Sequence, residues 1–516
     1  MRSSIDARRN SGWSHGFTLT LILLLVLQSG LTHANGAAFS SLPSDTVSRI
    51  DEIFANYALD AHVPGLVYGI VADGRLIYVK GLGVQDLDSK RPVDADTLFR
   101  IASMTKAFTA LTVLKLRDDG KLRLDELAET YVREMRGWNY PTQDSPRIRV
   151  RDLLNHTSGL VTDDPWGDRQ TPLPEEEFSK LLREGVPFTR TPGLGMEYSN
   201  LGFAMLGRIV TNVSRKPYAK TIGKTILQPL GMSSSGFVVD EAPRERRALG
   251  YRWEDDQWKA EPTMAHGAFG AMGGLQTSAN DYSRWVAFLL SAWPARDEAD
   301  LGPIKRATVR ELVQGLNFPR LRDRFGRSGA QSCKQVATYG MGMWVAVDCD
   351  LGLTLYHGGG YPGYGSHVML MPDYGVGVFA FANRTYAGPS VAVWDAAVEL
   401  KKAGLLKERV VPISEDLASA YAAVGEIYRS GDVAVAGQHL AMNFLMDRDA
   451  AGWKSDLATL KKKVGECATD AAIKATGALA GEFTWRCASG RVGGVLLLAP
   501  TRPASIQSLR LEIKTP

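Results

Sequence analysis

The stretch that decides the fold of this chain is Phe99-Arg100-Ile101-Ala102-Ser103-Met104-Thr105-Lys106. The next ten residues, 107–116, have apolar side chains at helical spacing, and Asp119-Gly120 is a typical helix stop. We therefore expect Ser103 at the start of a helix and Lys106 one turn further on. Residues at i and i+3 share a helix face, so the lysine amine should lie near the serine hydroxyl. Such an amine can take the proton of a serine that is otherwise a poor nucleophile at neutral pH.

The composition is that of an ordinary globular protein with more than one domain. The chain has 516 residues, of which 45% are hydrophobic and 22% are charged. The formal net charge of +4 is small for this length, and there is no basic run. Neither a nucleic-acid partner nor a membrane-surface partner is therefore expected.

Residues 1–34 have the pattern of a signal peptide. Several arginines within the first nine residues precede an apolar run from Phe17 to Leu27, and Thr32 and Ala34 fit a cleavage site after Ala34. The apolar run is shorter than the ~20 residues that a spanning helix needs. We expect export to the periplasm or the medium and no membrane span in the mature chain, and an uncleaved membrane anchor is the alternative.

The cysteines of the chain number four, which suits an exported protein. Of the three possible pairings, proximity favours Cys333 with Cys349 and Cys467 with Cys487. Each bond would be worth roughly 3 kcal/mol in the chain-entropy model. Free buried thiols are the alternative. The sequence has no Cys-x-x-Cys, no His-Glu-x-x-His and no tight histidine cluster, so neither a metal site nor a cofactor is expected.

The fold class is predicted from strands at both ends of residues 35–404 and helices between them. Residues 65–70 and 76–79 have strand patterns on either side of Asp73-Gly74, a strong hairpin signal, and strands return at 341–348, 354–357, 365–371 and 375–382. A glycine-rich turn is expected after residue 357. The prediction is an α+β fold in which an antiparallel sheet is flanked by helices and a helical domain is inserted between its strands.

A second unit is predicted for residues 405–516. Helical patterns cover residues 416–429 and 453–464, and strand patterns follow at 481–486, 491–498 and 506–513. This order predicts a small C-terminal α+β domain that contains its own disulfide.

Two further motifs supply chemical partners for Ser103. Tyr198-Ser199-Asn200 opens a predicted helix after a Pro-Gly loop, and a tyrosine oxygen can relay a proton if nearby cations lower its pKa. The run His357-Gly358-Gly359-Gly360 follows a predicted strand, where glycines let a substrate approach the backbone closely. A backbone N–H of this run and that of Ser103 could form an oxyanion hole.

In their order and context these motifs resemble the penicillin-recognising serine hydrolases, in particular the class C β-lactamase-like branch with its D-Ala-D-Ala carboxypeptidases, D-aminopeptidases and esterases. Residues 153–160, 226–232 and 273–278 are similar to that family too. The resemblance covers roughly residues 44–404 and implies an α+β fold of the β-lactamase/transpeptidase-like type. It implies that Ser103 is the acylated nucleophile, Lys106 its base and Tyr198 the proton shuttle. It also implies that Asn200 and Gly359 contact substrate, and that the N–H groups of Ser103 and Gly360 hold the oxyanion.

His357 departs from the family pattern. Many members have Lys-Thr-Gly at this place, where the lysine helps to fix a substrate carboxylate. A histidine is mostly neutral at pH 7 to 8, and it can still donate one hydrogen bond to the substrate or to Tyr198. We therefore expect short aryl esters to react better than penicillins or cephalosporins. His156, in a loop that is structural in this family, is expected to be structural here.

The function expected from the sequence is that of an exported serine hydrolase that forms an acyl-enzyme with a small-molecule ester or a D-amino-acid amide or peptide. A D-Ala-D-Ala carboxypeptidase and a class C-type β-lactamase are the alternatives within the family. A non-catalytic penicillin-binding-like sensor or binding module is the alternative of another class. The sequence does not predict the oligomeric state.

Overall fold

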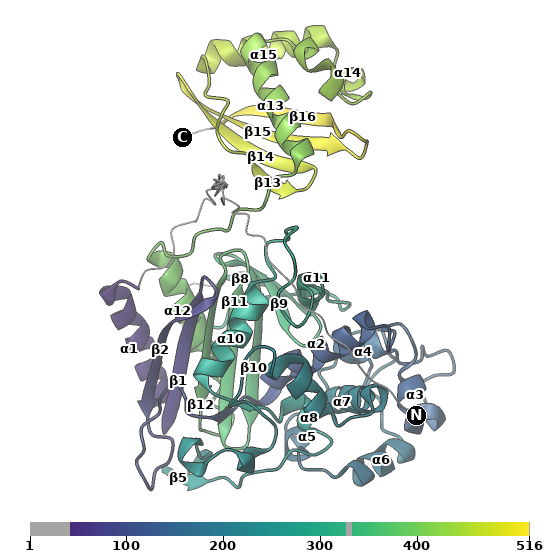
Figure 1. Cartoon of the computed structure of the whole chain (residues 1–516), viewed down its shortest axis with the longest axis vertical. Helices are drawn as coiled ribbons and strands as arrows, with labels where there is room; N and C mark the ends of the chain where they lie inside the picture. The colour runs from purple at the N-terminus through teal and green to yellow at the C-terminus, as the bar shows by residue number, and fades with distance from the viewer. Residues whose placement is uncertain (1–41, 327–332, 515–516) are drawn as a thin grey trace, which may run out of the picture. The chain divides into compact units, whose positions relative to one another are not determined.

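The computed structural model describes residues 42–326 and 333–514, so the expected signal peptide lies outside the described residues (Figure 1). Its largest sheet has eight antiparallel strands in the order β2-β1-β12-β11-β10-β9-β8-β7. The strands are β1 (Gly65–Ala72), β2 (Arg75–Gly83), β7 (Arg320–Asp323), β8 (Lys334–Tyr339), β9 (Trp344–Asp348), β10 (Gly352–Tyr361), β11 (Tyr364–Met371) and β12 (Val376–Ala382).

Strand β1 pairs on one side with β12, the last strand of this sheet in the sequence, and on the other side with β2 in a hairpin. Asp73 and Gly74 form the tight turn between β1 and β2, and both have positive φ, +49° and +73°. This conformation suits the twist of a two-residue hairpin and explains the Asp-Gly signal. Every residue of β1 is buried, because this strand has a neighbouring strand on each side and both of its faces are covered.

Helices cover both faces of the sheet. On one face, α1 (Ser44–Asp60) and α12 (Ser390–Lys402) share a core with Val378 of β12. On the other face, α2 (Thr105–Asp118) and α10 (Ala279–Leu290) share a core with Phe379, the next residue of β12. Figure 1 shows α10 lying over the strands of the sheet. Adjacent residues of β12 enter opposite cores because side chains alternate along a strand.

The predicted helical insertion lies in the sequence between β2 and β7. Helix α2 is buried on nearly all sides, so it is the central helix rather than a surface one. Besides α10, the other α-helices described there are α3 (Ala128–Tyr131), α4 (Val150–Leu154), α5 (Trp166–Arg169), α6 (Glu175–Glu184), α7 (Asn200–Ser214), α8 (Tyr218–Ile222), α9 (Gly270–Gly273) and α11 (Arg306–Arg310). Two small ribbons accompany them, β3 (Phe99–Arg100) with β6 (Gln276–Thr277) and β4 (Tyr251–Glu254) with β5 (Gln257–Ala260). The α+β class predicted from the sequence is confirmed.

The prediction of a glycine-rich turn directly after His357 is wrong. Residues 358–360 continue β10 and pair in register with β11, and the turn falls later, at Pro362-Gly363. The cause is close packing against the nucleophile turn. A Cβ at Gly359 would lie 2.4 Å from the carbonyl oxygen of Ile101 and 2.2 Å from Ser366 Oγ, so a glycine is needed inside this strand.

The C-terminal residues form a small sheet domain with a core of its own. Its core contains Ile427, Trp485 and Leu496. The elements are α13 (Glu415–Ser430), α14 (Phe444–Asp447), α15 (Ala450–Val464) and the four antiparallel strands β13 (Lys474–Gly477), β14 (Ala480–Cys487), β15 (Gly490–Ala499) and β16 (Ser505–Lys514). Cys467 and Cys487 form a disulfide within it. Among the residues that the structure describes, no helix is long and apolar enough to cross a bilayer.

Candidate active site

Ser103 lies in a short 3-10 turn, Ala102–Met104, directly before α2 rather than in α2 itself. The turn is backbone-strained, because Ala102 has φ +48°, a conformation that costs an L-residue roughly 1–2 kcal/mol. It is held against the sheet by Ser366, whose hydroxyl donates to the carbonyl oxygen of Ile101 at 2.8 Å. Backbone strain maintained by its surroundings is typical of functional sites.

Lys106 reaches Ser103 as the sequence spacing suggests. Its side chain is fully buried, and Nζ lies 3.0 Å from Ser103 Oγ, 2.7 Å from Asn200 Oδ1 and 3.0 Å from the carbonyl oxygen of Met272. An ammonium donates to all three oxygens, but a neutral amine has only two protons and one lone pair. The amide and carbonyl oxygens can only accept, whereas a hydroxyl can also donate. The lone pair of neutral Lys106 is therefore directed at the Ser103 proton.

Burial lowers the pKa of Lys106 to about 8. Asp164, Asp168 and Asp163 oppose this effect and favour the ammonium. The histidines that face the amine, His156 and His357, have pKa values lowered by burial and by Lys106 itself, so they are neutral at pH 7. A lysine with a pKa near the working pH is suited to general-base chemistry.

Tyr198 lies beside this pair, with Lys106 Nζ 4.9 Å from the centre of its ring. A relay role of the kind expected from the sequence would require nearby cations to lower the pKa of this tyrosine. Burial instead raises it well above the ordinary value, against an opposing interaction with the Ser103 hydroxyl. Tyr198 is therefore a neutral phenol that can hand on a proton, and not a standing phenolate base.

The imidazole ring of His156 packs against the ring of Tyr198. The centres of the two rings are 4.3 Å apart, and His156 Nδ1 accepts a hydrogen bond from the Ser199 backbone N–H at 3.1 Å. The imidazole is 1% exposed. These contacts fit the structural role expected for this histidine.

Asn200 is already bound on both sides of its amide. Oδ1 accepts from Lys106, and Nδ2 donates to the carboxylate of Asp164. The backbone N–H groups of Asn200 and Leu201 donate to the two oxygens of Asp163, at 2.6 and 2.9 Å, which caps the first turn of α7. In this geometry Asn200 holds the lysine, and its expected contact with substrate would require the amide to exchange partners.

His357 also has both ring nitrogens engaged. Nδ1 lies 2.6 Å from the carbonyl oxygen of Gly358, and Nε2 lies 3.0 Å from the hydroxyl of Tyr339. A carbonyl only accepts, so Nδ1 carries the proton and Nε2 accepts from Tyr339. Burial lowers the pKa of His357 to about 3. The side chain is thus neutral and bonded to Gly358 and Tyr339, rather than available to donate to a substrate or to Tyr198.

The backbone of β10 passes along the nucleophile turn. A Cβ at Gly359 would lie 3.1 Å from Ala102 Cβ and closer still to the Ile101 carbonyl oxygen. Gly360 is the next residue of the strand and pairs with Gly365. The structure therefore brings the strand that carries both glycines directly beside Ser103.

A segment that the sequence analysis did not identify completes the site. Asp164 is exposed and binds Asn200, whereas Asp168 is 3% exposed and accepts a hydrogen bond from Tyr386 at 3.1 Å. Burial and the charge of Asp164 raise the pKa of Asp168 to about 7. Gly167 packs against Asn200, since a Cβ there would lie 2.8 Å from Asn200 Cβ. The only sequence signal was an Asp-Asp-Pro run, which is equally typical of an ordinary turn.

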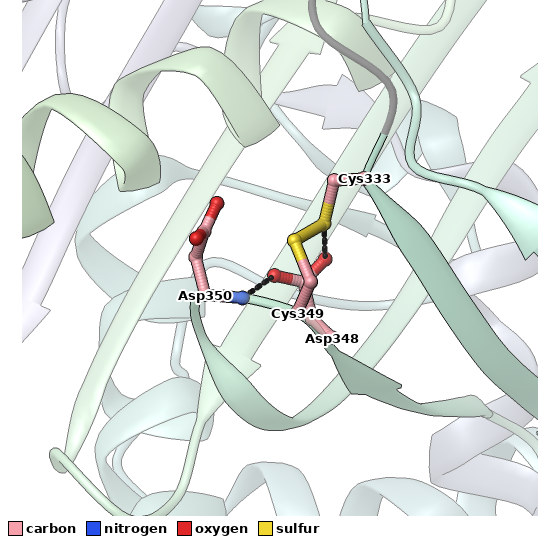
Figure 2. A group of neighbouring side chains, drawn as sticks. All are labelled: Cys333, Asp348, Cys349 and Asp350. Carbon is pink, nitrogen blue, oxygen red and sulfur yellow. Dashed lines mark hydrogen bonds between the residues drawn. A yellow bond between two sulfur atoms is a disulfide. The ribbon is translucent and has the colours of Figure 1, made fainter.

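Among residues 42–326 and 333–514, one group of potential metal ligands occurs outside this site, namely Cys333, Asp348, Cys349 and Asp350 (Figure 2). Cys333 and Cys349 form a disulfide, so their sulfurs are not thiolate ligands. The buried carboxylate of Asp348 already accepts from Arg324, from Gln335 Nε2 at 2.6 Å and from two backbone N–H groups. These contacts satisfy the hydrogen-bonding capacity of the Asp348 carboxylate. The group is therefore a disulfide beside the ion pair of Asp348 with Arg324.

The fold and the site together define a serine hydrolase-like protein, and the chain belongs to the Beta-lactamase family, which it matches over residues 50–402. It is 29% identical to Protein flp of Staphylococcus aureus (strain COL) over 353 aligned residues. This aligned region covers 67% of this chain and 65% of flp. It is 32% identical to Esterase EstB of Burkholderia gladioli over 219 aligned residues, and this aligned region covers 40% of this chain and 55% of EstB.

A solved structure resembles the fold over most of its length. The octameric penicillin-binding protein homologue from Pyrococcus abyssi superposes with a TM-score of 0.59 and covers 88% of this chain and 91% of that one. The sequence identity is 21%. This likeness supports the β-lactamase/transpeptidase-like fold.

Proposed function

We propose that this protein is an exported serine hydrolase that forms an acyl-enzyme at Ser103, with short-chain esters as its substrates. The observation that carries the proposal is the environment of Lys106. Its amine lies 3.0 Å from Ser103 Oγ, and two fixed acceptors, Asn200 Oδ1 and the Met272 carbonyl, take up its protons. No other arrangement of the neutral amine satisfies these two acceptors and the serine proton together.

The proposed first step is transfer of the Ser103 proton to neutral Lys106 while Oγ attacks the ester carbonyl. The negative charge that develops on the carbonyl oxygen would be held by the N–H groups of Ser103 and Gly360. Collapse of this intermediate breaks the bond to the alcohol, which takes its proton from Lys106 directly or through Tyr198. Water then attacks the acyl group, gives up its proton by the same route and releases the carboxylic acid and the serine.

The preference for esters rests on the absence of charge at His357. The pKa of this side chain is lowered to about 3, and its ring is bonded to Gly358 and Tyr339. A substrate carboxylate would meet no cation from this residue, and a hydrogen bond to a charged group is worth roughly 1.5–3 kcal/mol. The similarity to an esterase supports the same substrate class. D-amino-acid amides without a free carboxylate remain within the proposal.

D-Ala-D-Ala peptides and β-lactams carry that carboxylate, so the carboxypeptidase and class C-type β-lactamase activities rank lower. A non-catalytic binding module would not need a neutral amine directed at the serine. Export is proposed from the pattern of residues 1–34, and the two disulfides are consistent with an oxidising compartment.

Intact-mass spectrometry tests the proposal directly. The purified protein is exposed to a fluorophosphonate, to p-nitrophenyl butyrate, to a D-Ala-D-Ala peptide and to a penicillin. With the fluorophosphonate we expect one adduct per chain, and with the ester we expect a burst of released p-nitrophenol, followed by absorbance. Both should vanish in Ser103→Ala. The matched control is Ser390→Ala, which removes a serine that is also hydrogen-bonded to a basic side chain, His367 at 3.0 Å. Labelling that survives in Ser103→Ala, or is lost in Ser390→Ala, would place the nucleophile elsewhere.

A further inference from the structure

Tyr386 has an unusual backbone conformation and lies close to β10, the strand beside Ser103. It follows β12 and has φ +55°, which is rare for a bulky residue. Its N–H faces the carbonyl oxygens of Tyr361 and Tyr364, at 3.4 and 3.2 Å, so the turn between β10 and β11 holds this conformation. The residue is nevertheless 41% exposed. A strained position that keeps an aromatic ring partly in solvent is better explained by function than by packing.

The ring of Tyr386 lies directly on Gly360. A Cβ at Gly360 would be 2.6 Å from Tyr386 Cδ1, so the ring covers the residue whose N–H is assigned to the oxyanion. At its far end, the hydroxyl donates to Asp168 Oδ2 at 3.1 Å. Asp168 belongs to α5, whose Gly167 packs on Asn200. The Tyr386–Asp168 bridge therefore links β10 to the segment that positions Asn200.

The geometry also indicates which part of a substrate meets this bridge. The leaving alcohol must receive a proton from Lys106 or Tyr198, and the Tyr198 ring centre lies 6.1 Å from that of His357. Gly360 is three residues further along β10, a distance of about 10 Å in an extended strand. With the leaving group at the His357 end, the acyl group extends toward Gly360 and Tyr386.

We propose that the bridge between Tyr386 and Asp168 closes the acyl end of the substrate site and limits the length of the acyl group. This inference rests on the proposed function and assigns a specificity-determining pair to it. Above pH 7, where Asp168 is mostly ionised, the bridge is a hydrogen bond to a buried carboxylate, which is stronger than one between neutral groups. Burial and Asp168 raise the pKa of Tyr386, so the hydroxyl keeps the proton that it donates.

Two variants of the full chain test the bridge. Tyr386→Asn removes the ring and keeps a residue that tolerates the left-handed conformation. Tyr386→Phe keeps the ring and removes only the hydroxyl. The control is Tyr374→Phe, which removes another tyrosine hydroxyl, one bonded to Lys401 at 3.2 Å. The measurement is kcat/KM for p-nitrophenyl acetate, butyrate and octanoate.

In Tyr386→Asn the octanoate-to-acetate ratio should rise at least about tenfold, since several added methylenes gain room. Tyr386→Phe should shift the ratio in the same direction by less, and Tyr374→Phe should leave it unchanged. A ratio in Tyr386→Asn equal to that of the natural protein overturns the inference. If that variant does not fold, as judged by thermal unfolding, Tyr386→Phe decides by the same criterion. Failure of the natural protein to react with any fluorophosphonate or ester would refute the proposed function instead.

Discussion

The pH dependence of acylation follows from the environment of Lys106. The base must be neutral to accept the Ser103 proton, and burial lowers its pKa to about 8. With that value, the neutral fraction of the amine is about 1% at pH 6, about 9% at pH 7 and about half at pH 8. A lysine with its ordinary pKa of about 10.4 would be only ~0.04% neutral at pH 7.

We therefore expect kcat/KM for p-nitrophenyl butyrate to rise about tenfold per pH unit between pH 5 and pH 7 and to level off above pH 8. Stopped-flow measurement of the acylation burst, after subtraction of spontaneous hydrolysis, gives this profile. A flat profile between pH 5 and pH 7 would exclude Lys106 as the base. A rise that continues past pH 9.5 would contradict the effect assigned to burial.

The sign of the shift can be tested by changing one neighbouring charge. Asp164 raises the pKa of Lys106 and is exposed, and Asn at this position keeps an acceptor for Asn200 Nδ2. Asp164→Asn should therefore move the acidic limb of the profile to lower pH. Asp144→Asn, at an exposed position not among the charges that act on Lys106, is the control and should leave it in place. A limb that moves to higher pH in Asp164→Asn would refute the electrostatic reasoning.

Three further predictions concern packing, buried charge and the C-terminal domain. Gly359→Ala should abolish fluorophosphonate labelling, because its Cβ would lie within 2.4 Å of two oxygen atoms, whereas Gly358→Ala, with its nearest neighbour at 3.4 Å, should retain labelling. The folded-state pKa of Asp168, about 7, lies above its unfolded value, so its contribution to stability falls as pH rises from about 4 to 7. Asp168→Asn should remove this dependence and stabilise the protein at pH 8 by up to about 4 kcal/mol in urea unfolding. Replacing Cys467 and Cys487 by Ser should destabilise the C-terminal domain by roughly 3 kcal/mol and leave the acylation rate unchanged.

Much of the fold could be predicted because its signals are local. The Asp73-Gly74 hairpin, the helix after Ser103 and the helix that begins at Asn200 each follow from turn residues or periodicity within a short window. Strand β10 was misjudged because three glycines favour a turn in isolation. Only the neighbouring Ile101 carbonyl, more than 250 residues away in the sequence, shows why glycine belongs in a strand there.

The candidate site was predictable only where a motif brings two groups together. The spacing of Ser103 and Lys106 predicts their contact, but the partners of Asn200 and His357 do not follow from spacing. Asp164 and Tyr339 take up the hydrogen bonds that sequence reasoning reserved for substrate. Their positions depend on tertiary packing of loops and strands that have no chemical signature of their own.

The three aspartates near Lys106 show why such residues matter to the proposed chemistry. Burial alone favours a neutral amine, yet a base that is hard to protonate cannot receive the serine proton. The charges of Asp163, Asp164 and Asp168 favour the ammonium that forms on proton transfer. A pKa of about 8 is the balance of these two effects, and it leaves Lys106 able both to accept a proton and to return it to the leaving alcohol. The segment from Asp163 to Asp168 therefore belongs to the proposed catalytic apparatus as fully as the Ser-x-x-Lys motif, although only its tertiary contacts reveal it.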